Sequence, residues 1–392
     1  MYKNICLVSP ALTNEEAFQI RNRLINQTWR TRWLRPSPYD ENYLYGQVMG
    51  ARGVTASVEI RDVRMVRYLP CDDDYLLLAG TGRRPWIEVK WEASAPYITV
   101  EGSVHKMMVG NDVAGGPSQF LPAASWFVDQ ISDLLDVPLP SCEEWAVKRI
   151  HYAESWDLSA EAITDILASV PRNTTARWSA TMDGSDSVHR GGKMTSVRIY
   201  RVGPEFLRDA PRLRSYMTET EFQNLLEVAD RRLRVESKIK AGKLCQNLGL
   251  RDRYPYVSEI SDGNIQAIYS DDLYRLCGEG RFGSFPVVRH PDSVRDRLSQ
   301  EYGKRLARNL FETWERLAEE GRRAVRKHPS ARTISEHQNK LIGAGCGWLG
   351  SSSDPDSCRV PDGFSLCRSD SRCCRDEDPR IIDMLIPYRG NS

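Results

Sequence analysis

Short runs in which apolar and polar residues alternate dominate the chain from the N-terminus to about Gly102. A period of two is typical of a β-strand with one buried face, and the Gly, Pro and Asp residues between the runs are typical of turns. We therefore expect this part of the chain to be mainly sheet. The predicted strands are residues 1–8, 54–60, 75–78, 86–91 and 97–101.

After this region, apolar residues at helical spacing alternate with further strand patterns. The periodicity predicts helices at residues 123–135, 159–170 and 218–230, and strands at 146–153, 176–182, 194–202 and 233–239. Ser159 is placed to cap the second helix and Pro171 to close it. This order of elements favours an α+β fold, with an antiparallel or mixed sheet backed by helices, over a doubly wound parallel sheet.

The last third of the chain has a different pattern. Apolar residues recur at every fourth position within residues 292–326, which predicts a long helix, and Thr333 and Glu336 have the spacing of a capping box that opens another. Beyond these helices the chain is rich in Cys, Ser and Asp. We expect an α+β domain over residues 1–250, a helical C-terminal region over 251–345 and a poorly ordered tail over 346–392.

Composition narrows the class of protein. The chain has 392 residues, of which 41% are hydrophobic, and its net charge of +1 means that any nucleic-acid site must be a local basic patch. The N-terminus lacks the pattern of a signal peptide and no apolar segment is long enough to span a bilayer, so we expect a cytoplasmic protein that does not enter membranes. Five of the ten cysteines lie near the C-terminus without the paired spacing of a zinc knuckle. Free thiols are therefore favoured over zinc there.

The predicted strand at residues 194–202 carries the most informative chemistry. Arg198 and Tyr200 lie on one of its faces, and Val197 and Ile199 on the other. Arginine offers a planar fork of donors to phosphate oxygens, and a phenol offers a nucleophilic oxygen once a base or nearby cations favour loss of its proton. These residues predict a tyrosine that attacks a phosphodiester. The alternative is a tyrosine that only packs.

Other predicted strands also carry ionisable groups on one face. These groups are Glu101, Arg149, His151, Arg234, Glu236 and Lys238. In the simplest interpretation this face is only solvated. In the alternative it holds a divalent metal, because Mg²⁺ and Mn²⁺ prefer oxygen ligands such as Glu236 or Glu101 and His151 can join for Mn²⁺.

Four segments follow one another in an order and at a spacing that are typical of one family. They are residues 100–115 with Lys106, Gly110 and Asn111; Arg149-Ile150-His151; Val197-Arg198-Ile199-Tyr200 with Glu205; and residues 225–250 with Arg234 and Glu236. On these segments the chain resembles the gene II/gene X replication initiators of filamentous phages and, more distantly, plasmid rolling-circle initiators. The likeness covers residues 100–250 well and 334–345 faintly.

The resemblance implies a replication-initiator-like fold and a defined activity. The protein would nick one strand at a phage or plasmid double-strand origin, keep the 5′ end as a phosphotyrosine on Tyr200, and later rejoin the displaced single strand. Arg198 would assist Tyr200, while the implied ligands of Mg²⁺ or Mn²⁺ are Glu236, His151 and Glu101. The residues implied in DNA binding are Lys106, Asn111, Arg149, Arg234 and Lys238. The domain at residues 1–250 would be the catalytic and origin-binding one.

The same resemblance implies partners and leaves some assignments open. The partners are a helicase and a polymerase of the bacterial host, in whose cytoplasm the protein would act, and assembly of several copies on the origin stays open. His151 stands where the family has Asp, which leaves Glu154 open as an alternative ligand. Asn111-Asp112 replaces the family's His-Asn or Asn-Asn. The alternative function is a non-catalytic regulator that binds an origin or operator.

Overall fold

The computed structural model describes residues 1–26, 43–62, 65–70, 86–91, 95–174, 180–251, 253–279, 286–325 and 331–366. The chain divides into two compact units. The first comprises Met1–Asp112, Gly116–Tyr152 and Lys238–Ile265, and the second comprises Val113–Gly115, Ala153–Ser237 and the chain from Gln266 onward. The predicted strand at residues 75–78, and residues 176–179 of the one at 176–182, lie outside the described residues.

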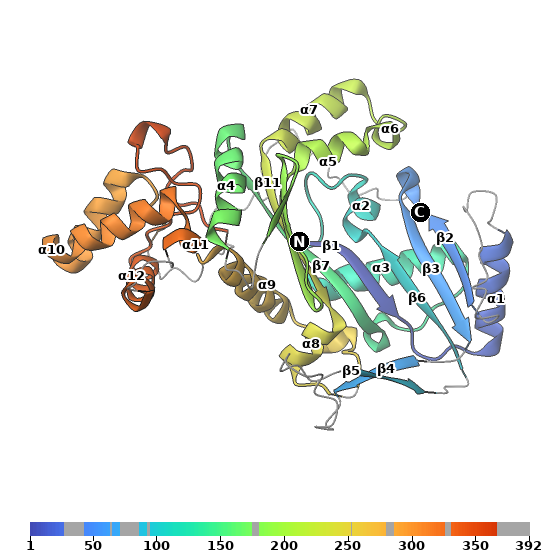
Figure 1. Cartoon of the computed structure of the whole chain (residues 1–392). Helices are drawn as coiled ribbons and strands as arrows, with labels where there is room; N and C mark the ends of the chain where they lie inside the picture. The colour runs from blue at the N-terminus through green and yellow to red at the C-terminus, as the bar shows by residue number, and fades with distance from the viewer. Residues whose placement is uncertain are drawn as a thin grey trace. The chain divides into compact units, whose positions relative to one another are not determined.

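Nine strands form one antiparallel sheet, which confirms the predicted α+β class (Figure 1). Its strand order is β2-β3-β6-β1-β7-β11-β10-β9-β8. The strands are β1 (Tyr2–Val8), β2 (Tyr43–Met49), β3 (Thr55–Asp62), β6 (Pro96–Gly102), β7 (Ala146–Asp157), β8 (Thr181–Asp183), β9 (Ser187–Arg190), β10 (Thr195–Arg201) and β11 (Arg232–Lys240). A separate antiparallel pair joins β4 (Met65–Pro70) to β5 (Trp86–Trp91), and β5 spans the predicted residues.

Helices of the first unit include a long amphipathic one at the predicted place. The helices are α1 (Asn14–Asn26), α2 (Val104–Val109), α3 (Phe120–Leu135) and α8 (Ala241–Leu248), and α9 (Asp262–Cys277) begins in this unit. α3 buries Phe127 and Ile131 fully, as its helical spacing of apolar residues predicts.

Helices of the second unit fall into two groups along the chain. The first group is α4 (Ala160–Asn173), α5 (Val202–Arg208), α6 (Ala210–Leu213) and α7 (Glu219–Asp230); the second is α10 (Pro291–Glu319), α11 (Arg322–Val325) and α12 (Ala331–Gly343). α5 starts directly after β10 and packs against α7 (Figure 1). Along the chain, residues 202–230 therefore form a helical insertion between β10 and β11, which are neighbours in the sheet.

Several boundaries follow from local signals, and some differ from the prediction. The Ser159 hydroxyl accepts a hydrogen bond from the amide of Ala162 at 3.2 Å and caps α4, as predicted. α4 nevertheless continues through Pro171 to Asn173. The predicted helix at 292–326 is interrupted, because Gly303 and Gly321 adopt φ of 72° and 78°, in the left-handed region that favours glycine.

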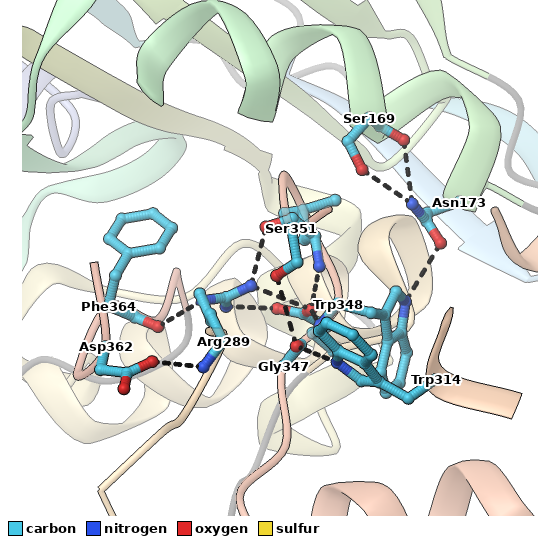
Figure 2. A network of polar contacts seen from close by, with 11 residues as sticks. Ser169, Asn173, Arg289, Trp314, Gly347, Trp348, Ser351, Asp362 and Phe364 are labelled. Carbon is cyan, nitrogen blue, oxygen red and sulfur yellow. Dashed lines mark hydrogen bonds and ion pairs between the residues drawn. The ribbon is translucent and has the colours of Figure 1, made fainter. Parts of the chain in front are cut away.

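The C-terminal helices share an apolar core with the segment that follows them. Trp314 and Trp348 are fully buried in this core. Figure 2 shows the polar contacts around it: Trp348 Nε1 donates to Asn173 Oδ1 at 3.1 Å, and Trp314 Nε1 donates to the carbonyl of Gly347 at 2.7 Å. Residues 346–366, which the sequence assigns to a loose tail, thus include a well-packed segment, whereas residues 367–392 lie outside the described ones.

No helix among the described residues combines the length and the apolar character that crossing a membrane requires.

Candidate functional site

Tyr200 lies near the end of β10, and its side chain is buried. The residue is 1% exposed and belongs to an apolar cluster of the second unit. The other buried members are Val113, Val202, Phe206, Ala210, Leu213, Phe222, Leu225 and Ala229. Alternation along β10 correctly separates Tyr200 from Val197 and Ile199, but the face that carries Tyr200 is not simply solvated. Helices α5, α6 and α7 supply most of the residues that cover it.

Polar groups nevertheless reach the phenol ring of Tyr200. Its hydroxyl donates a hydrogen bond to Glu236 Oε2 at 3.3 Å, and the Arg198 guanidinium carbon lies 4.5 Å from the ring centroid. Arg198 also forms an ion pair with Glu205 of α5, at 3.5 Å between Nη1 and Oε2. The structure therefore brings together a phenol, a carboxylate that accepts a hydrogen bond from the phenol hydroxyl, and a guanidinium that lies over the ring.

One face of β11 carries three of the charged residues in this unit. Arg232, Arg234 and Glu236 alternate with Leu233 and Val235, as the period of two predicts. Glu236 is half-buried and contacts Tyr200, whereas Arg232 and Arg234 are only 5% and 0% exposed. Alternation places these residues on one face but does not tell which part of that face is covered.

The predicted DNA-binding residue Arg234 is an interior residue in this structure. Its Nε donates to Ser155 Oγ at 2.9 Å, and its Nη2 donates to the main-chain carbonyl of Val113 at 3.3 Å. Arg232 donates to the same carbonyl. Because the side chain is wholly covered, we correct its expected role from a direct contact with DNA to support of the interior around Val113.

The segment with Lys106 and Asn111 forms a short helix and a tight turn in the first unit. Ser103 caps α2 by accepting a hydrogen bond from the amide of Lys106 at 3.3 Å, and Gly110 ends the helix with φ of 90°. Asp112 is buried, lying 3.2 Å from the Lys3 amine and 3.9 Å from that of Lys106. Asn111 is 5% exposed, so Lys106 presents more of its side chain to solvent than Asn111 does.

Glu101, Arg149 and His151 lie on strands of the first unit. Glu101 and Arg149 are both paired with Cys6 in the strand register and form an ion pair with each other. His151 is half-buried opposite Asn4, and Lys238, also half-buried, lies on the part of β11 that belongs to this unit. Burial raises the pKa of the Cys6 thiol, while Lys148 and Arg149 act in the opposite direction.

The predicted metal ligands Glu236, His151 and Glu101 lie on β11, β7 and β6. In the part of the chain that the structure describes, no group of three or more His, Cys, Asp or Glu side chains is placed to hold a metal ion. We derive no chemical step through a metal from this arrangement.

No protein-family model and no curated protein matches the chain. The assignment of function therefore rests on the residues themselves.

Three contacts at the site were not predicted from the sequence. Val113 and Ser155 interact with Arg234, and Glu205 pairs with Arg198. Glu205 lies five positions after Tyr200 in a segment already singled out by the resemblance, so its spacing was a usable signal. Val113 contributes a carbonyl and Ser155 a hydroxyl from other parts of the chain, and no pattern in the sequence indicates those contacts.

Proposed function

We propose that this chain is a rolling-circle replication initiator, a site-specific DNA endonuclease that nicks one strand at a double-strand origin and later rejoins the displaced strand. The observation that carries the proposal is the contact of the Tyr200 hydroxyl with the Glu236 carboxylate, beside the guanidinium of Arg198. A phenol with a carboxylate base and a cation has what a tyrosine nucleophile requires. The resemblance of residues 100–250 to phage initiators supplies the substrate, origin DNA.

The proposed reaction transfers one phosphodiester from DNA to protein and back. Glu236 takes the proton of the Tyr200 hydroxyl, whose oxygen forms a bond to phosphorus as the bond from phosphorus to the 3′ oxygen breaks. The leaving oxygen takes a proton from solvent and becomes a free 3′-hydroxyl. The 5′ end stays as a phosphotyrosine, and attack by a 3′-hydroxyl reverses the step without ATP.

Arg198 and Glu205 have a supporting part in this reaction. The Arg198 guanidinium contacts the phosphate that reacts and offsets the charge that develops on its oxygens. Glu205, 3.5 Å from Arg198, limits the positions that the guanidinium adopts. The expected requirement for Mg²⁺ or Mn²⁺, and contacts with a host helicase and polymerase, belong to the proposal as parts inferred from the resemblance.

Burial of the Tyr200 ring sets a condition on the mechanism. With 1% of the residue exposed, DNA reaches the hydroxyl only after the apolar cluster around the ring has partly opened. We therefore expect a slow step between binding of the origin and cleavage. The same burial favours the alternative function, a regulator that binds an origin or operator without cutting it, because packing alone would explain an interior tyrosine.

One experiment separates the two functions. The origin is first located by footprinting. Supercoiled plasmid that carries it is then incubated with the protein and Mg²⁺ or Mn²⁺, and open circles and protease-sensitive 5′ adducts are measured. We expect both products from the wild type and neither from Tyr200→Phe, although this variant still shifts the origin. Tyr216→Phe is the matched control, since Tyr216 is a partly buried tyrosine at the edge of the same cluster. A wild type that shifts the origin without cutting it would make the protein a regulator.

A further inference from the structure

Two buried arginines of β11 converge on a single main-chain oxygen. Arg234 donates to the carbonyl of Val113 at 3.3 Å, and Arg232 donates to the same carbonyl. Arg234 also donates from Nε to Ser155 Oγ at 2.9 Å. Burying a guanidinium costs free energy unless its donors are satisfied, and placing two like charges at one acceptor adds repulsion. Both guanidinium groups therefore hold the main chain at Val113.

The residue held by these arginines lies in the cluster that contains the nucleophile. Val113 is 0% exposed and belongs, with Tyr200, to the same apolar cluster. Its main chain is thus fixed by guanidinium groups while its side chain helps to fill the interior around the phenol ring. On the same face of β11, Glu236 accepts the hydrogen bond of the Tyr200 hydroxyl. β11 therefore carries both Arg234, which holds Val113 in the cluster around the ring, and Glu236, which accepts the hydrogen bond of the hydroxyl.

We propose that Arg234 is a positioning residue for Tyr200, acting through Val113, with Arg232 as a second support of the same carbonyl. This inference rests on the proposed function, because it assigns a role in the reaction of Tyr200. Arg234 sets the place of Val113, Val113 limits the positions of the phenol ring, and Glu236 orients the hydroxyl. The geometry of attack is sensitive to displacements of about 1 Å, which can change a rate by about a hundredfold.

Lysine cannot replace arginine in this arrangement. The guanidinium of Arg234 reaches Ser155 and Val113 with two different nitrogens, whereas an ammonium is a single compact cation at the end of a flexible chain. Arg234→Lys keeps the charge and much of the volume but loses the fixed span between the two acceptors. Its expected defect is therefore one of geometry.

The test compares two conservative substitutions of fully buried arginines in the same unit. Arg234→Lys is compared with Arg289→Lys, whose guanidinium is also 0% exposed but contacts Glu279 and the carbonyls of Leu349 and Phe364. Cleavage of an origin oligonucleotide is measured below the unfolding temperature of each variant. We expect Arg234→Lys to lower kcat at least about tenfold with KM within about twofold, and Arg289→Lys to leave both unchanged per folded molecule.

A second readout keeps the test independent of cleavage. 3-Fluorotyrosine is introduced at position 200, and its ¹⁹F resonance is expected to shift or broaden in Arg234→Lys and in Val113→Ala, but not in Arg289→Lys. Val113→Ala serves if Arg234→Lys does not fold, and it should lower kcat in the same way. If the wild type cleaves DNA and Arg234→Lys changes neither kcat nor the ¹⁹F resonance, the positioning role of Arg234 is overturned and the proposed function stands. A wild type that never cleaves DNA would overturn the proposed function, whatever the resonance does.

Discussion

Arg234 and Arg289 are both fully buried in the second unit, but their surroundings differ in kind. Arg289 directs two nitrogens at the Glu279 carboxylate, at 3.2 and 2.6 Å, and donates to the carbonyl of Leu349. It also donates to the carbonyl of Phe364 (Figure 2). Arg234 donates to the Ser155 hydroxyl and the Val113 carbonyl, and Glu236, two positions along the same strand, accepts a hydrogen bond from the Tyr200 hydroxyl.

The two carboxylates near these arginines, Glu279 and Glu236, have different kinds of partner. Glu279 Oε1 also accepts hydrogen bonds from the main-chain amides of Trp348 and Leu349, and so holds the segment after α12. That network is complete within the chain and stabilises a fold. Around Tyr200, by contrast, a carboxylate is paired with a phenol, which is a group able to react. We therefore expect the Glu279 network to govern stability and the Glu236 contact to govern activity.

The largest expected effect is the loss of stability when Glu279 is changed. Glu279→Ala leaves Arg289 buried without its carboxylate and frees the amides of Trp348 and Leu349. We expect a loss of about 3–5 kcal/mol in the free energy of unfolding of this unit. Denaturant unfolding followed by tryptophan fluorescence measures it. A loss below about 1 kcal/mol would mean that this network does not hold the segment.

The next effect concerns the carboxylate at the candidate site. Glu236→Gln keeps the size of the side chain but removes the base for the Tyr200 hydroxyl. We expect nicking of the origin plasmid to fall about a hundredfold or more, with little change in the unfolding transition. Gel quantitation of open circles checks the first and thermal unfolding the second. Should the Gln variant unfold as readily as Glu279→Ala while still cutting DNA, the contrast between the two carboxylates would be reversed.

Sequence patterns predicted strands well where alternation is local. The strand that carries Arg198 and Tyr200, the limits of β5 and the cap of α4 at Ser159 all follow from neighbouring residues. The cover over Tyr200 did not, because a period of two defines two faces of a strand and not which face later helices bury. α5 starts at Val202, inside the stretch predicted as strand, and its Phe206 then packs in the Tyr200 cluster.

The segment after α12 was mispredicted for a related reason. Its Cys, Ser and Asp residues are typical of a loose tail, yet Trp348 is fully buried there. Its order depends on Glu279 and Asn173, which lie far away in the sequence. Burial also raises the pKa of the Cys346 thiol to about 12. Such long-range polar contacts leave no periodic signal.

The smallest expected effect tests the helices that cover Tyr200. Thr218 and Glu221 form a capping box at the start of α7, and hydrogen bonds from the main chain and hydroxyl of Thr218 lower the pKa of the Glu221 carboxyl. A lowered pKa stabilises the fold above the pKa of the unfolded state, and this contribution is lost as the pH falls through the lower folded value. Thr218→Ala should cost about 1 kcal/mol at neutral pH.

This cost should shrink in acid, because Glu221 then carries a proton in wild type and variant alike. Unfolding of both proteins at neutral pH and at a pH below the folded pKa of Glu221 measures the change. Thr164→Ala is the control, because the Thr164 hydroxyl donates to the Ala160 carbonyl within α4 and accepts from Arg201. If Thr218→Ala lowers the free energy of unfolding equally at both pH values, the ionised Glu221 carboxylate does not contribute to the stability of this cap. If α7 limits access to Tyr200, Thr218→Ala should also cleave DNA faster than the wild type. The slow step would then be the opening of the helices that cover Tyr200, and not the chemical step.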